Sequence, residues 1–468
     1  EFRLDLVGVA ALLSRAMHYD SIAAVRDLLS FIDRSPTSFH AVLSCVSFLE
    51  ELGFTALSER GHWELSAGDR RYVTRNDGSI VALVIGSESS VDAGFRVIGA
   101  HTDSPHPKVK PNGSLVKQGY RQLAVETYGG MLLSTWLDRD LSLAGRVVLE
   151  NPAEPGGLRS VFVDLRRPLL RIPNLAIHLD RDVNSKGLVV NQQQHLPPVL
   201  GLSLGDPTDY RHLENLLSEH IKLEYGYGVE PAEILDWDLS LYDTQKATLA
   251  GDRDVFIQAA RLDNLASCHA ALSALSDSLR EHATRAGTRM ICFWDHEECG
   301  SRSMQGAMGP FIRQVIERIV DVLTPGDRQA FHRAIASSFL VSADMAHALH
   351  PNYFDRHEAG HQPKMGAGPV IKTNNNQSYA SDGVSSARFA ALCKAEGFEA
   401  QRYVVRSDLP CGSTIGPITS ALLGIRSVDV GNPMLSMHSA REMAGTADHA
   451  KMIAVMRRFF GQDEVTRA

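Results

Sequence analysis

Residues 290–298 read MICFWDHEE: a run of five apolar side chains ends in an aspartate, a histidine and two glutamates. The apolar run predicts a buried strand. In open α/β sheets, ligands bind at the carboxyl ends of the strands, so polar residues that directly follow such a run are candidates for chemistry.

Three other apolar segments end in the same way. They are residues 95–100 before His101-Thr102-Asp103, residues 255–260 before Asp263-Asn264, and residues 339–343 before Asp344. One such ending would be explained as a helix cap or a solvated charge. Four together predict that carboxylates and a histidine meet at one edge of a sheet. Buried carboxylates crowded at one place repel one another unless a cation lies among them, so the pattern predicts a metal site. Ligands without cysteine indicate zinc, manganese or cobalt in a hydrolytic site.

The segments around these strands predict an α/β fold. Strands are expected at residues 72–75 and 80–85, on either side of the turn Asn76-Asp77-Gly78. Helices are expected at 266–279 and 311–323, after two N-terminal helices that end at Gly53, the second capped by Ser35 or Thr37. Between residues 104 and 250 the pattern changes to short β-rich runs. We therefore expect a mixed, mostly parallel sheet flanked by helices, built from residues 1–103 and 251–468, with an inserted β-rich domain over residues 104–250.

Composition narrows the classes of partner. A chain of 468 residues is long enough for two domains, and its net charge of -8 argues against a nucleic-acid or anionic-membrane partner. The apolar run at residues 6–13 is too short to span a bilayer. The six cysteines are scattered without a CxxC pair, which indicates no disulfide framework and favours a reducing cytoplasm.

Eight stretches, in this order along the chain, resemble the aspartyl aminopeptidase family of dinuclear metallopeptidases. They are GAHTDSP at 99–105, WLDRDLSLAGR at 136–146, NLAIHL at 174–179, RLDN at 261–264, DHEE at 295–298, SADMAHALHPNY at 342–353, CGSTIGP at 411–417 and MHS at 437–439. The resemblance implies the zinc-dependent exopeptidase type of fold, with the insert used for dimerisation and for assembly of a dodecamer. It also implies two zinc ions per subunit, with manganese or cobalt as alternatives. The implied substrates are peptides that have a free N-terminus and start with Asp or Glu.

The same resemblance assigns roles to individual residues. Asp263 would bridge two metals, with His101 and Asp344 completing one site and Glu298 and His438 the other. Asp103 would fix the tautomer of His101. Glu297 would be the general base that accepts a proton from water and passes it to the leaving amine. The substrate pocket would contain His347, Lys372, Tyr379 and, from the inserted domain of a neighbouring subunit, His178. Lys372 is the expected partner of an acidic substrate side chain.

Three positions depart from the family pattern. Ser378 stands where family members carry Arg, and Asp382 where they carry Asn, which weakens the expected attraction for an acidic substrate. Cys299 replaces an apolar residue, and we expect it to be buried as a small apolar side chain rather than to bind metal.

Two other motifs have simpler explanations. Residues 357–361 match HExxH, but that motif binds zinc only on a helix, and Gly360 and Pro363 predict a loop here. Asp138 and Asp140 are expected in a structural ion pair or turn.

Two other functions stay open at this point. The chain could be an inactive self-assembling scaffold or cargo protein, or a related dinuclear deacylase or carboxypeptidase, because a fold does not determine the substrate.

Overall fold

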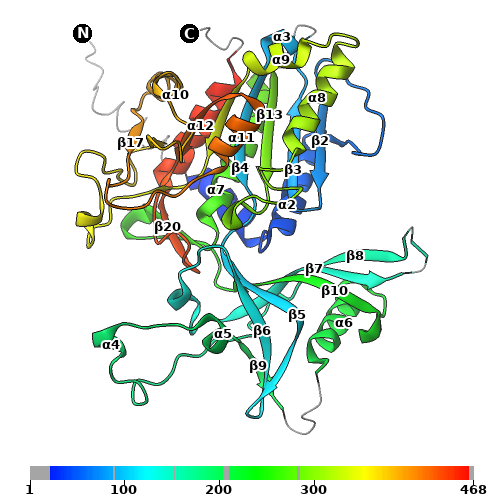
Figure 1. The fold of residues 1–468 in the computed structure, drawn as a ribbon, viewed down its shortest axis with the longest axis vertical. Coiled ribbons are helices and arrows are strands. Elements are labelled where there is room, and N and C mark those ends of the chain that lie inside the picture. Colours follow the sequence, from blue (N-terminus) through cyan, green and yellow to red (C-terminus); the bar gives the residue numbers. More distant parts are fainter. Residues whose placement is uncertain are drawn as a thin grey trace, which may run out of the picture.

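The computed structural model describes residues 22–87, 90–151, 153–154, 156–203, 210–281 and 285–462. Figure 1 shows a large body of sheet and helices above a smaller β-rich unit. The predicted α/β class is confirmed. Among the described residues, no helix combines the length and the apolarity needed to cross a membrane.

The large body is built on a nine-stranded mixed sheet with the order β1-β2-β3-β13-β4-β14-β18-β16-β17. Its central strands β13, β4, β14 and β18 are parallel, whereas β3 runs antiparallel to both β2 and β13, and β16 runs antiparallel to β18. The strands are β1 Thr55–Ala56, β2 Arg70–Arg75, β3 Ser79–Val84, β4 Phe95–His101, β13 Thr288–Trp294, β14 Phe339–Ala343, β16 Val370–Lys372, β17 Gln401–Tyr403 and β18 Arg426–Gly431.

Both faces of this sheet are covered by helices, which explains why its central strands are apolar along their length. In β3, Ile80 and Ala82 face one hydrophobic core, whereas Val81 and Leu83 face the other. The first core also contains the helix at residues 22–33, α2 Ser38–Glu51, α7 Leu262–Glu281, α10 Gly383–Ala395 and α12 Thr446–Phe460. The second contains α8 Phe311–Leu323, α9 Ala330–Ala336 and α11 Ile415–Leu423.

Local signals in the sequence correctly located several element ends. Thr37 caps α2, because its hydroxyl accepts a hydrogen bond from the backbone N–H of His40. Asn76 and Asp77 both have positive φ in the turn between β2 and β3, as the Asn-Asp-Gly sequence predicts. Helix α8 has the predicted bounds.

One strand belongs to a different sheet from the one expected. The segment before Asp263 forms β12 Phe256–Ala259, which pairs antiparallel with its neighbours in a separate five-stranded sheet. That sheet has the order β11-β12-β20-β19-β15, with β11 Thr248–Ala250, β15 Ala346–His347, β19 Pro433–Leu435 and β20 Glu442–Gly445. The prediction that the strand before Asp263 lies in the parallel sheet is therefore wrong.

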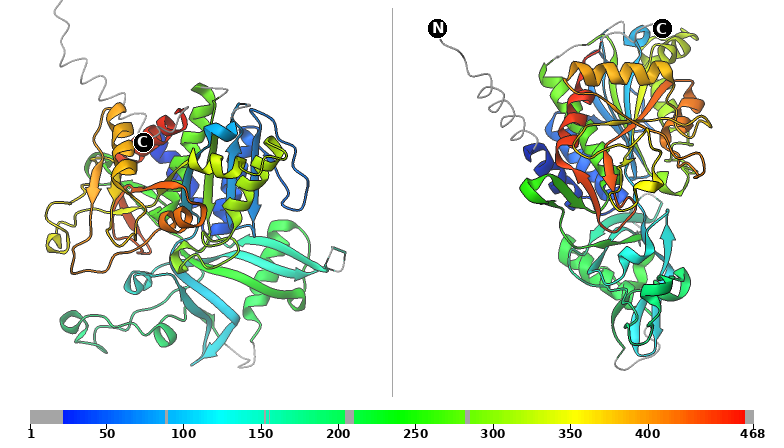
Figure 2. Two further views of the ribbon diagram at one scale, coloured as in Figure 1. Left: turned by 45° about the horizontal axis from the view of Figure 1, so that its top comes forward. Right: turned by 90° about the vertical axis from the view of Figure 1, so that its left-hand side faces the viewer.

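The β-rich unit contains a six-stranded antiparallel sheet packed on α6 His212–Tyr225 (Figure 2). Its order is β8-β7-β10-β5-β6-β9, and its strands are β5 His106–Lys117, β6 Tyr120–Tyr128, β7 Leu141–Glu150, β8 Leu158–Asp164, β9 Val199–Leu202 and β10 Ile234–Asp243. Short helices are α3 Ser90–Ala93 in the body and α4 Val183–Lys186 and α5 Gln192–His195 in the β-rich unit. These strands all lie within residues 104–250, the range expected for the insert, whereas β11 at the end of that range pairs with β12 in the five-stranded sheet.

Candidate metal centre

Three neighbouring parallel strands end side by side and deliver polar residues to one place. His101 is the last residue of β4 and pairs with Trp294, the last residue of β13. Glu297 and Glu298 follow β13 in a short 3₁₀ turn, and Asp344 follows β14. Because β13, β4 and β14 are adjacent and parallel, these side chains meet at the carboxyl edge of the sheet.

Asp263 reaches the same place from the start of α7. Its Oδ1 lies 3.3 Å from His101 Nε2, and its Oδ2 lies 3.5 Å from His438 Nε2. His101 Nε2 is also 3.5 Å from Asp344 Oδ1, and His438 Nε2 is 3.3 Å from Glu298 Oε2. All five predicted ligands are thus brought together, with one Asp263 oxygen facing each histidine.

The donor set fits divalent cations. Asp263 Oδ1 and Glu298 Oε1 are buried without a hydrogen-bond partner among the described residues, although a buried carboxylate oxygen normally has one. Three groups of residues place candidate ligand atoms within 4.8 Å of one another: His101 with Asp263 and Asp344, Asp263 with Glu298 and His438, and His101 with Glu297 and Glu298. Nitrogen and carboxylate donors without thiolate suit catalytic zinc, manganese or cobalt.

The pKa shifts express the same crowding. Burial and the Asp263 carboxylate raise the pKa of Glu298 to about 7. Burial disfavours a charged imidazole, but Asp263 and Glu298 raise the pKa of His438 to about 11. Crowded, buried groups with such shifts are those that a bound divalent cation would stabilise in their deprotonated form.

Asp103 lies behind the cluster and joins its parts. It is 4% exposed, and its Oδ1 is 3.3 Å from His101 Nδ1. The His101 Nδ1 is also 3.0 Å from the Asp103 carbonyl oxygen. The Asp103 carboxylate accepts hydrogen bonds from the backbone N–H groups of Glu297 and Glu298, both at 3.1 Å. A His101 ring that donates its Nδ1–H to Asp103 would have Nε2 free for a metal.

Glu297 lies in the wall of an open pocket in front of the cluster. No hydrogen bond or ion pair engages its carboxylate within the described part of the chain. Burial, with the nearby carboxylates of Asp344, Glu298 and Asp103, raises the pKa of Glu297 to about 9. A carboxylate free of protein partners can exchange a proton with a molecule bound in the pocket.

The pocket also contains three of the predicted substrate residues. His347, Lys372 and Tyr379 line it together with the segment Gly412–Thr414. Lys372 is 2% exposed, and its Nζ lies 3.3 Å from Asp344 Oδ2, 3.0 Å from the Met345 carbonyl oxygen and 5.2 Å from the centre of the Tyr379 ring. It is the one Lys or Arg among the described residues that line this pocket.

His178 is not brought to the pocket within one chain. It is exposed and lies in the turn at residues 177–179, between β8 and α4 of the β-rich unit. Its entry into the pocket of a neighbouring subunit stays a prediction.

Two residues that the sequence reasoning missed support the cluster from behind. Glu442 accepts hydrogen bonds from the backbone N–H of Asp263 at 3.1 Å and of His438 at 2.8 Å. Burial and the charge of Asp263 raise the pKa of Glu442 well above its ordinary value. Its position four residues after His438 was the available signal. Tyr128, from β6, donates to Asp103 and had no signal in the sequence.

One expectation about a neighbour of the glutamate pair is wrong. Cys299 is exposed rather than buried, because the 3₁₀ turn that directs Glu297 and Glu298 inward leaves the third residue outward.

The HExxH stretch forms a loop, as predicted. The 3₁₀ turn Phe354–Arg356 ends before it, residues 357–361 are not helical, and His361 contacts Glu358 within the motif. His357 accepts a hydrogen bond from the backbone N–H of His350.

Replacing His357 by alanine should therefore leave metal content unchanged. The two histidines of the motif lack the shared helical face that zinc binding needs. Elemental analysis of the purified protein measures this, with His438→Ala as the control expected to lose metal. A loss of metal in His357→Ala would show that the loop contains a metal site.

Fold and site together define a metal-dependent hydrolase. The family model described as Aminopeptidase I zinc metalloprotease (M18) matches residues 31–460, and the chain belongs to this family of zinc metallo-aminopeptidases. A curated relative from Ectopseudomonas mendocina, named Probable M18 family aminopeptidase 2, is 48% identical over 442 residues, which cover 94% of this chain and 99% of the relative.

Solved structures agree in fold. The chain is similar to that in the cryo-EM structure of the Ape4 and Nbr1 complex, at 40% identity and a TM-score of 0.90, covering 94% of this chain and 86% of that one. It is also similar to the mApe1 dodecamer of S. cerevisiae, at 28% identity and a TM-score of 0.79, covering 95% and 99% of the two chains. The resemblance stated from the motifs is confirmed at the level of the family.

Proposed function

We propose that this aminopeptidase binds two metal ions, zinc or alternatively manganese or cobalt, and that Asp263 would be a ligand of both. The observation that carries the proposal is the division of the Asp263 carboxylate, whose Oδ1 faces His101 and whose Oδ2 faces His438. Asp344 joins His101 in one site, and Glu298 joins His438 in the other. When bound, such a pair polarises a carbonyl group and lowers the pKa of water.

The side chains around the pair supply the remaining chemistry. Glu297 takes a proton from water in the pocket and passes it to the amine that leaves when the peptide bond breaks. Asp103 keeps the His101 ring in one orientation, and Glu442 ties the backbones of Asp263 and His438 together. The overall change is addition of water across one peptide bond, which releases the N-terminal residue.

A preference for N-terminal Asp or Glu follows from Lys372. It is the cation of the pocket, and a compact ammonium can pair with a substrate carboxylate. The sequence suggested that the charge of Asp382 would weaken this preference. In the structure the Asp382 carboxylate caps α10 and accepts a hydrogen bond from the backbone N–H of Ser385. Asp382 is not among the residues that line the pocket. Its charge therefore weighs little against an acidic substrate.

We also propose that the chain forms a homo-oligomer, and that the complete assembly is a dodecamer. The segment that carries His178 exposes apolar side chains that a partner copy would cover: Leu175, Ile177, Leu179, Leu188 and Val189. His178 would then enter the pocket of a neighbouring subunit. The mApe1 relative is a dodecamer. The cysteines are free thiols, which suits a cytoplasmic location.

A panel of aminoacyl substrates tests the specificity. With zinc, manganese or cobalt supplied, kcat/KM for Asp or Glu substrates should exceed that for Ala, Leu and Lys substrates by at least about tenfold, or about 1.4 kcal/mol. N-acetylated peptides should not be cleaved, whereas a deacylase would act on them. Equal rates on Leu and Asp substrates would contradict the acidic preference, and full assembly without metal would favour the scaffold alternative.

A further inference from the structure

The end of strand β6 enters the metal centre from the β-rich unit. We call residues 128–132 the β6 exit segment. The hydroxyl of Tyr128 donates a hydrogen bond to Asp103 Oδ2 at 2.6 Å. The same carboxylate also accepts hydrogen bonds from the backbone N–H groups of Glu297 and Glu298. Tyr128 therefore acts on the base and on a ligand through one intermediate residue.

The following residues contact the second half of the centre. The Gly130 carbonyl oxygen accepts a hydrogen bond from His438 Nδ1 at 3.0 Å, which leaves Nε2 for a metal. The N–H of Leu132 donates to the His438 carbonyl oxygen at 2.9 Å. Gly129 has a φ of +68°, and a Cβ at this position would lie 3.0 Å from the Cβ of Glu298. Only a glycine lets the backbone pass so close to this ligand.

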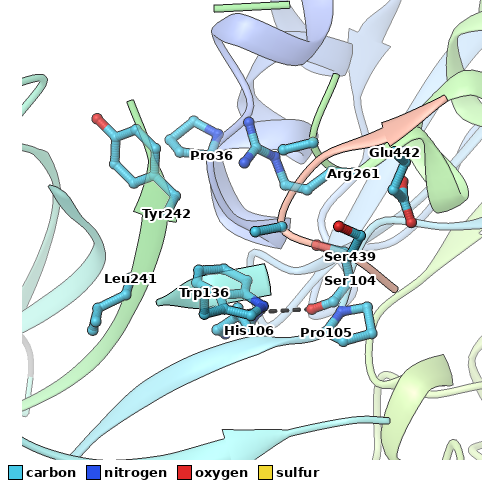
Figure 3. Close-up of a pocket in the computed structure, with 12 residues that line it drawn as sticks. Pro36, Ser104, Pro105, His106, Trp136, Leu241, Tyr242, Arg261, Ser439 and Glu442 are labelled. Carbon is cyan, nitrogen blue, oxygen red and sulfur yellow. Dashed lines mark hydrogen bonds between the residues drawn. The ribbon is translucent and has the colours of Figure 1, made fainter. Parts of the chain in front are cut away.

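Tyr128 is itself held from behind. Its ring stacks on His106 at a centroid distance of 4.9 Å and an interplanar angle of 19°. His106 Nδ1 donates to the Ser104 carbonyl oxygen at 2.7 Å, the contact drawn as a dashed line in Figure 3, and its Nε2 accepts from the Ser240 hydroxyl at 2.7 Å. The stack is therefore anchored in β5 and β10 of the β-rich sheet.

We propose that the β6 exit segment positions the metal ligands, with Tyr128 orienting Asp103 and the glutamate pair and the Gly130 carbonyl orienting His438. The inference rests on the proposed metal centre. Groups that orient metal ligands typically change metal affinity or activity about 10- to 100-fold when removed. The β-rich unit then sets metal affinity directly, in addition to its role in assembly.

The first test removes one hydroxyl. Tyr128→Phe should bind zinc at least about tenfold more weakly in competition with a chelator, and the visible spectrum of its cobalt form should change. The matched control is Tyr225→Phe on helix α6, which removes a hydroxyl that donates to the Phe162 carbonyl oxygen in the same unit at 2.6 Å. Its zinc affinity and cobalt spectrum should equal those of the wild type. Melting of the metal-free proteins separates a general loss of stability from a change in metal binding.

The second test adds one methyl group. Gly129→Ala should weaken zinc binding at least as much as Tyr128→Phe, because its Cβ presses on Glu298. Gly119→Ala is the matched control at the other end of β6, with a similarly positive φ and no atom within 4 Å of the added Cβ.

Equal zinc affinity and cobalt spectra in wild type, Tyr128→Phe and Gly129→Ala would overturn the inference. A wild type that takes up no metal would refute the metal centre itself, and the inference with it.

Discussion

Replacing Glu297 by glutamine should lower kcat by about 10²- to 10⁴-fold while both metal ions stay bound. Glutamine has nearly the same shape but cannot accept a proton at neutral pH. The Glu297 carboxylate has no protein partner to lose within the described chain, so the substitution removes the base and leaves the ligands in place.

Metal content and turnover are measured on the same preparation. The neighbouring Glu298→Gln is the informative control, because it alters a predicted ligand and should lose metal together with activity. If Glu297→Gln kept more than about a tenth of the wild-type kcat, the role of general base would have to move to another group.

Replacing Asp263 by asparagine should abolish metal binding and activity together. An amide offers one neutral oxygen in place of two negative ones, yet Asp263 faces His101 with one oxygen and His438 with the other. Metal ions contribute several kcal/mol to the stabilisation of such transition states. A loss of about 4 kcal/mol corresponds to a decrease of about 10³-fold in kcat/KM.

Elemental analysis gives the ion count, and thermal melting gives an independent readout. A ligand that binds the native state raises its stability, so zinc should raise the melting temperature of the wild type and not that of Asp263→Asn. An Asp263→Asn protein with two bound ions would show that this carboxylate does not bridge them. Asp138→Asn is a suitable control, since Asp138 pairs with Asn174 and Arg171 away from the centre.

The strand ends were predictable from the sequence because short apolar runs followed by polar residues mark them locally. Residues 95–103, 290–298 and 339–344 follow this pattern, and the structure places their ends side by side. The same pattern predicted the wrong sheet for β12, because an apolar run does not specify its partner strands. Asp263 reaches the centre all the same, since the five-stranded sheet directs the start of α7 toward it.

The roles of residues that act through long-range contacts could not be predicted from the sequence. Tyr128 lies in a β-rich run whose alternation resembles that of any half-buried strand, and nothing near it in sequence indicates that its hydroxyl meets Asp103. Glu442 and the outward direction of Cys299 depend on backbone geometry at turns. The roles of the ligands and of His178 came from family resemblance and stay predictions for experiment.

The proposed ligands are spread along the chain from His101 to His438, and Glu442, which ties two of them, comes later still. Translation must therefore pass His438 and Glu442 before the proposed centre can assemble. We expect a copy truncated before His438 to lack one proposed ligand and Glu442, and therefore to be inactive.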